Sequence, residues 1–215
     1  MKNEQNKIGL VVADDNEIQN MNEFKFVKSF NNNLNVNLYR FNNKLIYVIH
    51  SRIGLVNAAL ATQYLIDCFK VNAIWNYGAV GSTKKCKLYE VVIPQKFYYF
   101  DASSPWYKEG QIPGEKKFYL NSLKSSKKIN IASGNSFIND IKIINSLKEK
   151  INFDLIDMES CAIAQVCDKN NINFYCIKGI SDVIGENNIS TTKKDINISI
   201  TKASKLAFKK MIELM

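Results

Sequence analysis

Short apolar runs alternate along this chain with longer segments of helical period, and this alternation restricts the fold more than any other feature. Seven runs are bounded by turn residues and short enough for strands: 8–13, 45–50, 73–77, 90–100, 129–132, 155–158 and 174–180. Four segments repeat apolar residues at helical spacing: 56–71, 138–151, 159–169 and a last one from about Thr192. Strands that alternate with helices predict an α/β fold whose sheet is covered on both faces.

The last segment has a recognisable helix start. Thr192 is followed three residues later by Asp195, as in a capping box. Its buried face is expected to consist of apolar residues: Ile196, Ile198, Ile200, Ala203, Leu206, Ala207, Met211 and Leu214.

No internal boundary divides the chain. It has 215 residues, 46% of them hydrophobic, with no repeat and no Gly/Ser-rich linker, and its only near-repetitive stretch, Asn31-Asn32-Asn33, indicates a surface turn. We therefore expect one domain over residues 1–215, with a polar N-terminal tail of about residues 1–6.

The positive charge does not point to nucleic acid. Lys and Arg total 29 against 20 Asp and Glu, a net +9, but only Arg40 and Arg52 are arginines. Proteins that read bases and phosphates favour the planar fork of arginine over the point charge of lysine. No run approaches the roughly 18 apolar residues of a membrane span. We therefore expect neither nucleic acid nor a membrane as a partner.

Cysteine and histidine usage narrows both the compartment and the chemistry. Five cysteines, an odd number without a Cys-x-x-Cys pair, indicate reduced thiols, and the polar start lacks the apolar core of a signal peptide, so we expect a cytoplasmic protein. His50 is the only histidine and is interpreted as structural, so we expect no metal site and no organic cofactor. The glycine-rich loops that bind nucleoside triphosphates or dinucleotides are absent from the sequence. Any catalysis must rest mostly on carboxylates.

Two acids flank Met158 where a buried strand gives way to a helix. Helix capping can explain one of Asp157 and Glu159, because acids in a first turn complement the helix dipole. A ligand with hydroxyl groups, such as a sugar, better explains an ionised carboxylate that accepts two hydrogen bonds.

Two further acids stand near predicted strand ends, where open α/β sheets bind ligands. Asp182 comes just after the run at 174–180, where burial would make it a general acid, although an N-cap or an Asx-turn explains it equally well. Glu17 follows the first strand and could close the other side of the same pocket. Acids converging on one cleft predict acid/base chemistry on an uncharged polar substrate.

Six motifs occur in a characteristic order: Ser51-Arg52-Ile53-Gly54-Leu55-Val56-Asn57-Ala58-Ala59, Asn76-Tyr77-Gly78-Ala79-Val80-Gly81, Gly110-Gln111-Ile112-Pro113-Gly114, Ser133-Gly134-Asn135-Ser136-Phe137-Ile138, Asp157-Met158-Glu159 with Ala162-Ile163-Ala164-Gln165-Val166-Cys167, and Ile180-Ser181-Asp182. In order and spacing they resemble those of the 5'-methylthioadenosine/S-adenosylhomocysteine nucleosidases, from about Lys7 to the C-terminus. Met-Glu followed about twenty residues later by Ser-Asp is specific to the nucleoside phosphorylase/nucleosidase superfamily.

The resemblance implies a fold and an activity. The fold is a three-layer α/β/α arrangement with a mixed central sheet, active as a homodimer. The reaction is hydrolysis of the N-ribosidic bond of 5'-methylthioadenosine and/or S-adenosylhomocysteine, which releases adenine and a 5-thioribose product during methionine salvage.

The resemblance also assigns roles. It implies that Asp182 protonates purine N7, that Glu159 binds the ribose hydroxyls beside Met158, and that Glu17 activates water. The matching aromatic residue, Phe137, would stack on adenine, while Tyr107 and Pro113 would reach across the dimer to the partner's alkylthio pocket. The other substrate-binding positions carried over are Asp157, Ile138, Ser181, Ile53, Ala79 and Gly81.

The sequence departs from the family pattern at several of these places. The usual Gly-Ala-Met-Glu-Glu-Glu stretch is here Val12-Ala13-Asp14-Asp15-Asn16-Glu17, so Asp15 is an alternative to Glu17. The usual Ser, His and Arg are replaced by Ala79, Phe100 and Lys178.

Three alternative functions stay open on the sequence alone. A purine nucleoside phosphorylase of the same superfamily would use phosphate as nucleophile, but phosphate favours several arginines. The others are a nucleoside-binding relative without catalysis and a basic nucleic-acid binder.

Overall fold

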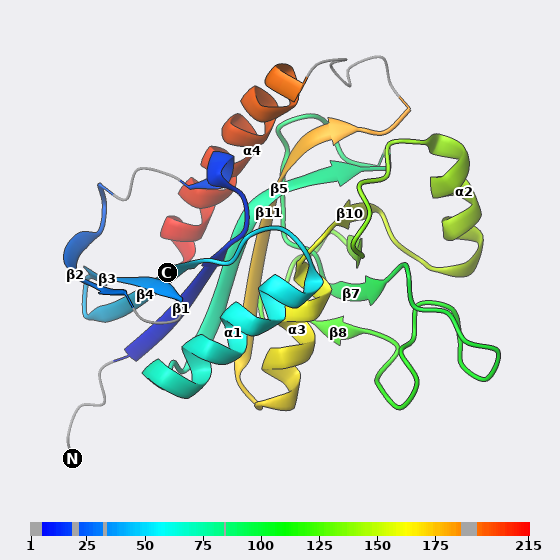
Figure 1. Ribbon diagram of the computed structural model, residues 1–215. Helices are drawn as coiled ribbons and strands as arrows, with labels where there is room; N and C mark the ends of the chain where they lie inside the picture. Colours follow the sequence, from blue (N-terminus) through cyan, green and yellow to red (C-terminus); the bar gives the residue numbers. More distant parts are fainter. Residues whose placement is uncertain (1–5, 19–21, 32–33, 84, 186–192) are drawn as a thin grey trace.

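The computed structural model describes residues 6–18, 22–31, 34–83, 85–185 and 193–215 (Figure 1). Its strands are β1 Asn6–Val12, β2 Lys25–Asn31, β3 Asn35–Phe41, β4 Lys44–His50, β5 Ala73–Ser82, β6 Val91–Val92, β7 Lys96–Tyr99, β8 Tyr119–Leu120, β9 Asn130–Ser133, β10 Leu155–Asp157 and β11 Asn173–Val183. Its helices are the 3₁₀ turn η1 Asp15–Glu17, α1 Leu55–Phe69, α2 Ile141–Lys150, α3 Ser160–Lys169 and α4 Lys193–Leu214.

One sheet contains all these strands. Its order is β2-β3-β4-β1-β5-β10-β9-β7-β8, and β11 pairs with both β5 and β6. The central strands β4, β1, β5 and β11 run parallel, whereas β10 is antiparallel to β5 and the β2-β3-β4 edge is antiparallel throughout. The sheet is therefore mixed, as the sequence predicted.

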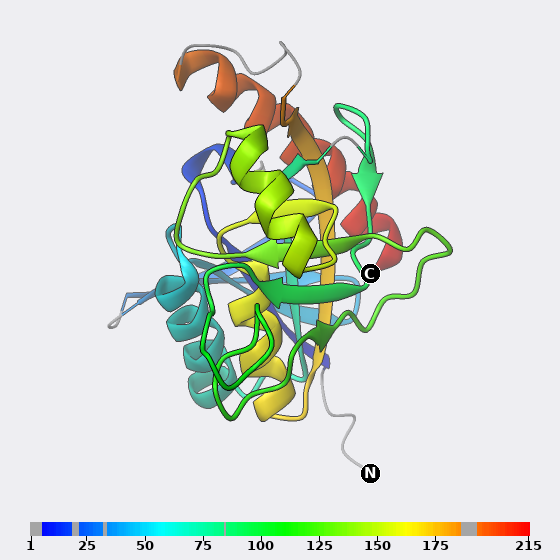
Figure 2. The ribbon, with the colours of Figure 1, turned by 90° about the vertical axis from the view of Figure 1, so that its right-hand side faces the viewer.

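Helices cover both faces of the sheet (Figures 1 and 2). On one face, Ala61 and Leu65 of α1 are buried in a core that includes Val11 of β1. On the other, Met211 of α4 packs in a core with Leu10, the neighbour of Val11. Successive residues of a strand point to opposite faces, so both faces of β1 are buried. This explains its uninterrupted apolar run and confirms the three-layer fold.

Most predicted strands and helices are present, with three corrections. The run at 90–100 forms two short strands, β6 and β7, because Pro94 between them has no N–H for a sheet ladder. The run at 73–77 extends to Ser82 as β5. Strands β2, β3 and β8 were not predicted. For β2 the reason is that it lies at the sheet edge with most side chains exposed and shows no apolar pattern.

The expected buried face of α4 is partly wrong. Ala203, Ala207 and Met211 are buried, but Ile198 is 57% exposed. It lies two residues, about half a helical turn, from the positions that form the buried stripe, so its side chain points to the opposite side of the helix. Leu206 and Leu214 are likewise exposed. The proposed cap residue Thr192 lies outside the described residues, as do Asn32 and Asn33 of the predicted surface turn.

None of the helices in the described part of the chain is long and apolar enough to cross a membrane.

Helix α4 lies unusually close to β11 at Gly179. A Cβ built at Gly179 would stand 2.1 Å from the carbonyl oxygen of Ala203, a distance that real Cβ atoms do not reach. Because the obstacle is helix backbone, a larger residue could be accommodated only by moving α4 away from the sheet.

Gly179→Ala should therefore lower the free energy of unfolding by more than about 2 kcal/mol, measured by urea denaturation. Gly114→Ala is the matched control, because a Cβ there meets nothing within 4 Å and only its left-handed φ of +80° is strained. That strain should cost about 1 kcal/mol. Equal losses in the two variants would contradict the close contact with α4.

Candidate active site

Strand direction brings the acids together. Leu155 and Ile156 of β10 pair antiparallel with Ser82 and Gly81, at the end of β5. The chain that leaves β10 is thus carried back along β5 toward Ala79, and Asp157 and the residues after it approach the middle of β5 instead of its end.

A bulge positions Asp182. In the ladder between β11 and β5, Ile180 pairs with Val80 and Asp182 with Gly81, which leaves Ser181 as an extra residue. Such a bulge re-aims the side chain that follows it. Asp182 lies inside β11, so the N-cap and Asx-turn explanations are wrong. Ser181 Oγ donates to Asp182 Oδ1 at 2.7 Å.

Glu17 is held by a capping box in η1. Asp14 is its N-cap residue, and the Asp14 N–H donates back to Glu17 Oε2 at 3.3 Å. On the other side, Glu17 Oε1 accepts from the Ala79 N–H at 2.6 Å. The carboxylate can come this close because residue 78 is glycine: a Cβ there would lie 2.3 Å from Glu17 Oε1.

Asp15, the alternative to Glu17, points elsewhere. Its side chain is 72% exposed and pairs with His50 at 3.4 Å and with Arg52 at 3.7 Å. His50 also contacts the carbonyl oxygen of Ala13 at 3.0 Å, in agreement with its structural interpretation. Of the two acids, only Glu17 is buried.

Glu159 does not cap its own helix. It stands at the N-cap position of α3 without a side-chain capping bond. Its Oε1 accepts from the Gly54 N–H at 3.0 Å and its Oε2 from the Met158 N–H at 3.2 Å. A carboxylate has about four acceptor positions, so each oxygen retains one for a ligand hydroxyl.

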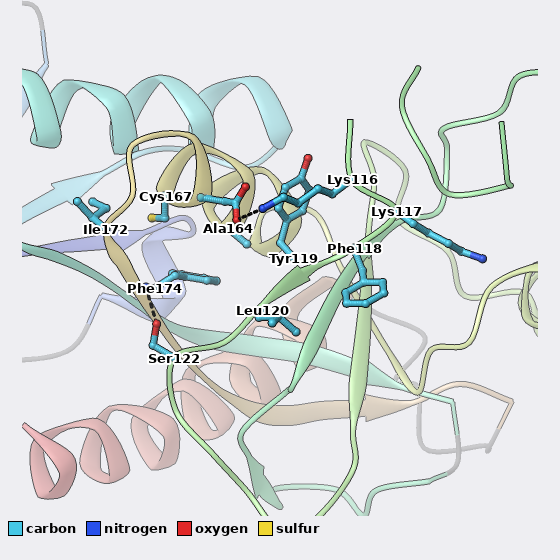
Figure 3. Close-up of a pocket in the computed structure, with 11 residues that line it drawn as sticks. Lys116, Lys117, Phe118, Tyr119, Leu120, Ser122, Ala164, Cys167, Ile172 and Phe174 are labelled. Carbon is cyan, nitrogen blue, oxygen red and sulfur yellow. Dashed lines mark hydrogen bonds and ion pairs between the residues drawn. The ribbon is translucent and has the colours of Figure 1, made fainter. Parts of the chain in front are cut away.

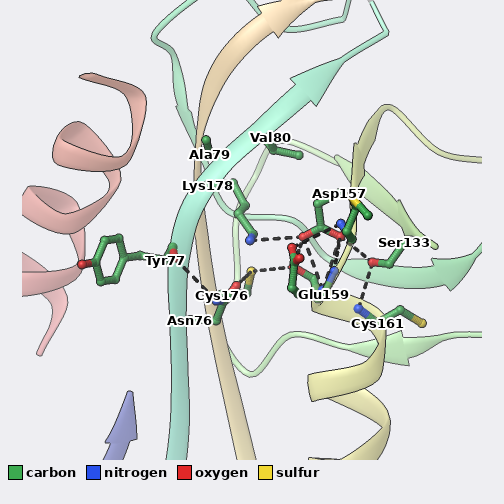
Figure 4. Close-up of polar contacts among 12 residues, drawn as sticks. Asn76, Tyr77, Ala79, Val80, Ser133, Asp157, Glu159, Cys161, Cys176 and Lys178 are labelled. Atoms are coloured by element: carbon green, nitrogen blue, oxygen red, sulfur yellow. Dashed lines mark hydrogen bonds and ion pairs between the residues drawn. The ribbon is translucent and has the colours of Figure 1, made fainter. Parts of the chain in front are cut away.

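Asp157 is the acid that caps α3, and it forms an ion pair with Lys178 (Figure 4). The Ser160 N–H donates to Asp157 at 3.3 Å and the Ser133 hydroxyl at 2.5 Å. Lys178 Nζ lies 3.1 Å from Asp157 Oδ2, and both side chains are almost fully buried. Asp157 is thus occupied by protein donors.

The electrostatics of the cluster follow from burial. Burial raises the pKa of Glu17, against the opposing effect of Lys178, and it raises the pKa of Glu159 to about 8 with help from the nearby Asp157. Burial likewise raises the pKa of Asp182, although the Ser181 hydroxyl bond opposes it. Burial disfavours the charge of Lys178, but the surrounding acids outweigh it and raise its pKa.

The four acids Glu17, Asp157, Glu159 and Asp182 line one cavity of about 140 Å³. Its lining is Ala13, Asp14, Glu17, Ile53, Ala79, Val80, Gly81, Phe137, Ile156, Asp157, Met158, Glu159, Ser181, Asp182, Ile196 and Ile200. The sequence did not predict that Asp14 lines the cavity. Nor did it predict this of Ile196 and Ile200, because they were expected to lie in the core as part of the apolar face of α4.

Three predicted site residues lie outside this cavity. Ile138 packs against the core around Tyr98 and Phe100. Tyr107 and Pro113 lie in an exposed segment between β7 and β8.

The roomier hollows of the described structure lack Glu17, Glu159 and Asp182. One of about 450 Å³ lies between β8 and α3, where Lys116 pairs with Asp168 at 2.6 Å (Figure 3). Another, of about 560 Å³, lies against the β2-β3-β4 edge and is lined by amides and aromatic rings. Within the described ranges, no three His, Cys, Asp or Glu side chains are grouped so that they could hold a metal ion. We therefore take the smaller cavity as the candidate active site, because of the acids that line it and not because of its volume.

Comparison with known structures agrees with the fold. The nucleosidase of Helicobacter pylori superposes with a TM-score of 0.86 at 22% identity, covering 98% of this chain and 99% of that one. The S-adenosylhomocysteine nucleosidase of Streptococcus pyogenes, solved with 5-methylthiotubericidin, gives 0.86 at 21% identity, covering 99% and 97%.

Sequence comparison identifies the family of the chain. The family model of the phosphorylase superfamily matches residues 7–213. The 5'-methylthioadenosine/S-adenosylhomocysteine nucleosidase of Buchnera aphidicola (subsp. Acyrthosiphon pisum, strain Tuc7) is 32% identical over an alignment of 232 positions. The alignment covers 97% of this chain and 100% of that protein. The chain therefore belongs to the phosphorylase superfamily and, within it, to the family of 5'-methylthioadenosine/S-adenosylhomocysteine nucleosidases.

Proposed function

We propose that this protein hydrolyses the N-ribosidic bond of 5'-methylthioadenosine and/or S-adenosylhomocysteine, releasing adenine and a 5-thioribose product in the recycling of these nucleosides. The observation that carries the proposal is the convergence of Asp182, Glu17 and Glu159 on one cavity. Each acid is held by different protein donors and suits a different task.

Asp182 supplies the proton. Adenine is a poor leaving group as an anion, so an acid must protonate its N7 while the C–N bond lengthens. The raised pKa keeps Asp182 protonated closer to neutral pH. Among the described residues, no group donates to Asp182 Oδ2, and this oxygen is available to carry the proton toward the base.

Glu17 takes a proton from water. As the C–N bond breaks, positive charge develops at the anomeric carbon and the water oxygen forms the new bond there. The proton lost by water passes to Glu17, while the electrons of the broken bond remain with the adenine that Asp182 has protonated. Two separated carboxylates with a water between them suit this inverting displacement.

Glu159 accepts from the ribose hydroxyls. Its two remaining acceptor positions match two neighbouring hydroxyl groups. Burial raises the pKa of Glu159 to about 8, and the positive charge that develops on the ribose favours its ionised form, so the interaction is stronger in the transition state. Asp157 supports the site indirectly, since its oxygens bind Ser133, Ser160 and Lys178. Phe137, 63% exposed at the cavity, is available to stack on the base.

Phosphorolysis is not favoured. A phosphate nucleophile needs cations, and neither arginine lines the cavity: Arg40 is exposed on β3 and Arg52 pairs with Asp15. The buried ammonium of Lys178 is already paired with Asp157. Glu17 and Glu159 repel an anion whenever they are ionised, whereas water carries no charge.

The active form is proposed to be a homodimer. Ile53, Val56 and Leu60 expose apolar side chains on and before α1, with exposed fractions of 48%, 75% and 55%. Trp106 and Tyr107 are exposed in the segment that, in this proposal, completes the partner's cavity at the 5' substituent. Contiguous exposed apolar residues of this kind are typical of interfaces.

The cytoplasm is the proposed compartment. Four of the five cysteines are buried as free thiols, a state that is maintained most readily where the surroundings are reducing.

Adenine release tests the proposed function. The wild-type protein should release adenine from 5'-methylthioadenosine in phosphate-free buffer. Chromatography of the products measures this release. Asp182→Asn should lower kcat by at least about a hundredfold, because an amide cannot deliver the proton. A strict requirement for phosphate would refute hydrolysis, and an unchanged rate in the variant would exclude Asp182 as the acid.

Glu17→Gln should also lower kcat by at least about a hundredfold, since the amide cannot accept a proton from water. Asp15→Asn is the matched control: it removes a neighbouring carboxylate that lies outside the cavity and should leave kcat within about twofold of the wild type. Equal losses in both variants would argue for a general effect of charge around η1.

Sedimentation velocity tests the dimer. We expect a dimer for the wild type, and a monomer of reduced activity for Val56→Asp, because the change puts a charge in the apolar patch. Leu120→Asp, which alters an exposed side chain on β8, should remain dimeric. An active wild-type monomer would refute the proposal.

A further inference from the structure

Asp14 is the one polar side chain of the cavity lining that the proposed reaction does not use. It is half-buried and follows β1 directly. Its Oδ1 accepts from the backbone N–H and the side-chain amide of Asn16, both at 2.7 Å. Among the contacts of the described residues, Oδ2 accepts no hydrogen bond.

No cation of the described chain pairs with Asp14. The side chains of His50 and Arg52 pair with the neighbouring Asp15 instead. The donors from Asn16 are neutral, so the negative charge of Asp14 is not balanced. An unbalanced carboxylate in a ligand cavity favours a ligand that brings a positive charge.

The sheet indicates which part of a nucleoside Asp14 would meet. Strand β5 pairs with β11 along one edge and with β1 and β10 along the other. Asp182 on β11 therefore lies across β5 from Asp14 and Glu159, which follow β1 and β10. Asp14 and Ile53 line the same cavity. If the base lies at Asp182 and the ribose hydroxyls at Glu159, as in the proposed function, the side of the cavity at Asp14 and Ile53 is left for the 5' substituent.

We propose that Asp14 makes the 5' end of the cavity selective for nucleosides whose 5' substituent carries an ammonium group. The inference rests on the proposed function and narrows it. 5'-Methylthioadenosine has an uncharged methylthio group at this position. S-adenosylhomocysteine has a zwitterionic amino-acid tail, of which the α-ammonium group would meet Asp14 while the α-carboxylate points away from it. Asp14 thereby favours S-adenosylhomocysteine of the two.

The test compares kcat/KM for three nucleosides in the wild type and in Asp14→Asn. The nucleosides are 5'-methylthioadenosine, S-adenosylhomocysteine and an analogue of the latter that lacks the α-amino group. Asparagine retains an N-cap acceptor, so η1 and Glu17 should stay in place. The control is Asp15→Asn, the adjacent exposed carboxylate.

In the wild type, we expect kcat/KM for S-adenosylhomocysteine to exceed that for the desamino analogue by about tenfold. Asp14→Asn should abolish this difference and lower the ratio of S-adenosylhomocysteine to 5'-methylthioadenosine by about tenfold. Asp15→Asn should leave both ratios as in the wild type.

Two results would overturn the proposal. Unchanged ratios in Asp14→Asn would mean that the carboxylate does not meet the tail. An equal loss for all three nucleosides would mean that Asp14 acts through the position of Glu17. If the folded wild type releases adenine from none of them, the proposed function fails separately, and dissociation constants for the same nucleosides and variants then decide the role of Asp14.

Discussion

The ion pair between Lys178 and Asp157 is the interaction on which the arrangement of the site depends. Two further acids with raised pKa values, Glu17 and Glu159, interact with this pair, and the buried ammonium of Lys178 offsets their charge. Removing one partner of a buried pair generally costs about 3–5 kcal/mol, because the other charge is left uncompensated. Through its bonds to Ser133 and Ser160, Asp157 also joins β9, β10 and the start of α3.

Close backbone approach is the second requirement of the site. Gly78 permits the contact between Glu17 and β5, since any Cβ there would overlap the carboxylate. Gly179 similarly permits α4 to lie against β11, which brings Ile196 and Ile200 to the cavity. One departure from the family pattern fits this packing: Phe100, in place of the usual His, lies against the small residue Gly134.

Much of the fold could be predicted because both faces of the central strands are buried. Apolar runs such as that of β1 are visible in the sequence, and so are the helices between them. The edge strand β2 could not be predicted, since most of its residues, Lys25–Asn31, are exposed and the strand shows no alternating apolar pattern. Ile198 was assigned to the core for the opposite reason: its side chain is apolar, but it points away from the stripe that packs on the sheet.

The sequence by itself determined the class of chemistry. With one histidine, two arginines and no metal-ligand cluster, the carboxylates had to carry catalysis, and the motif around Met158-Glu159 and Ser181-Asp182 identified the family. Only the tertiary structure decided which carboxylate does what, because burial and pairing depend on strand direction and on the bulge at Ser181. Asp14, Asp15 and Glu17 lie within four consecutive positions. Yet Asp14 lines the cavity, Asp15 pairs with surface cations, and Glu17 is buried beside β5. A single 3₁₀ turn separates them, since it points neighbouring side chains in different directions.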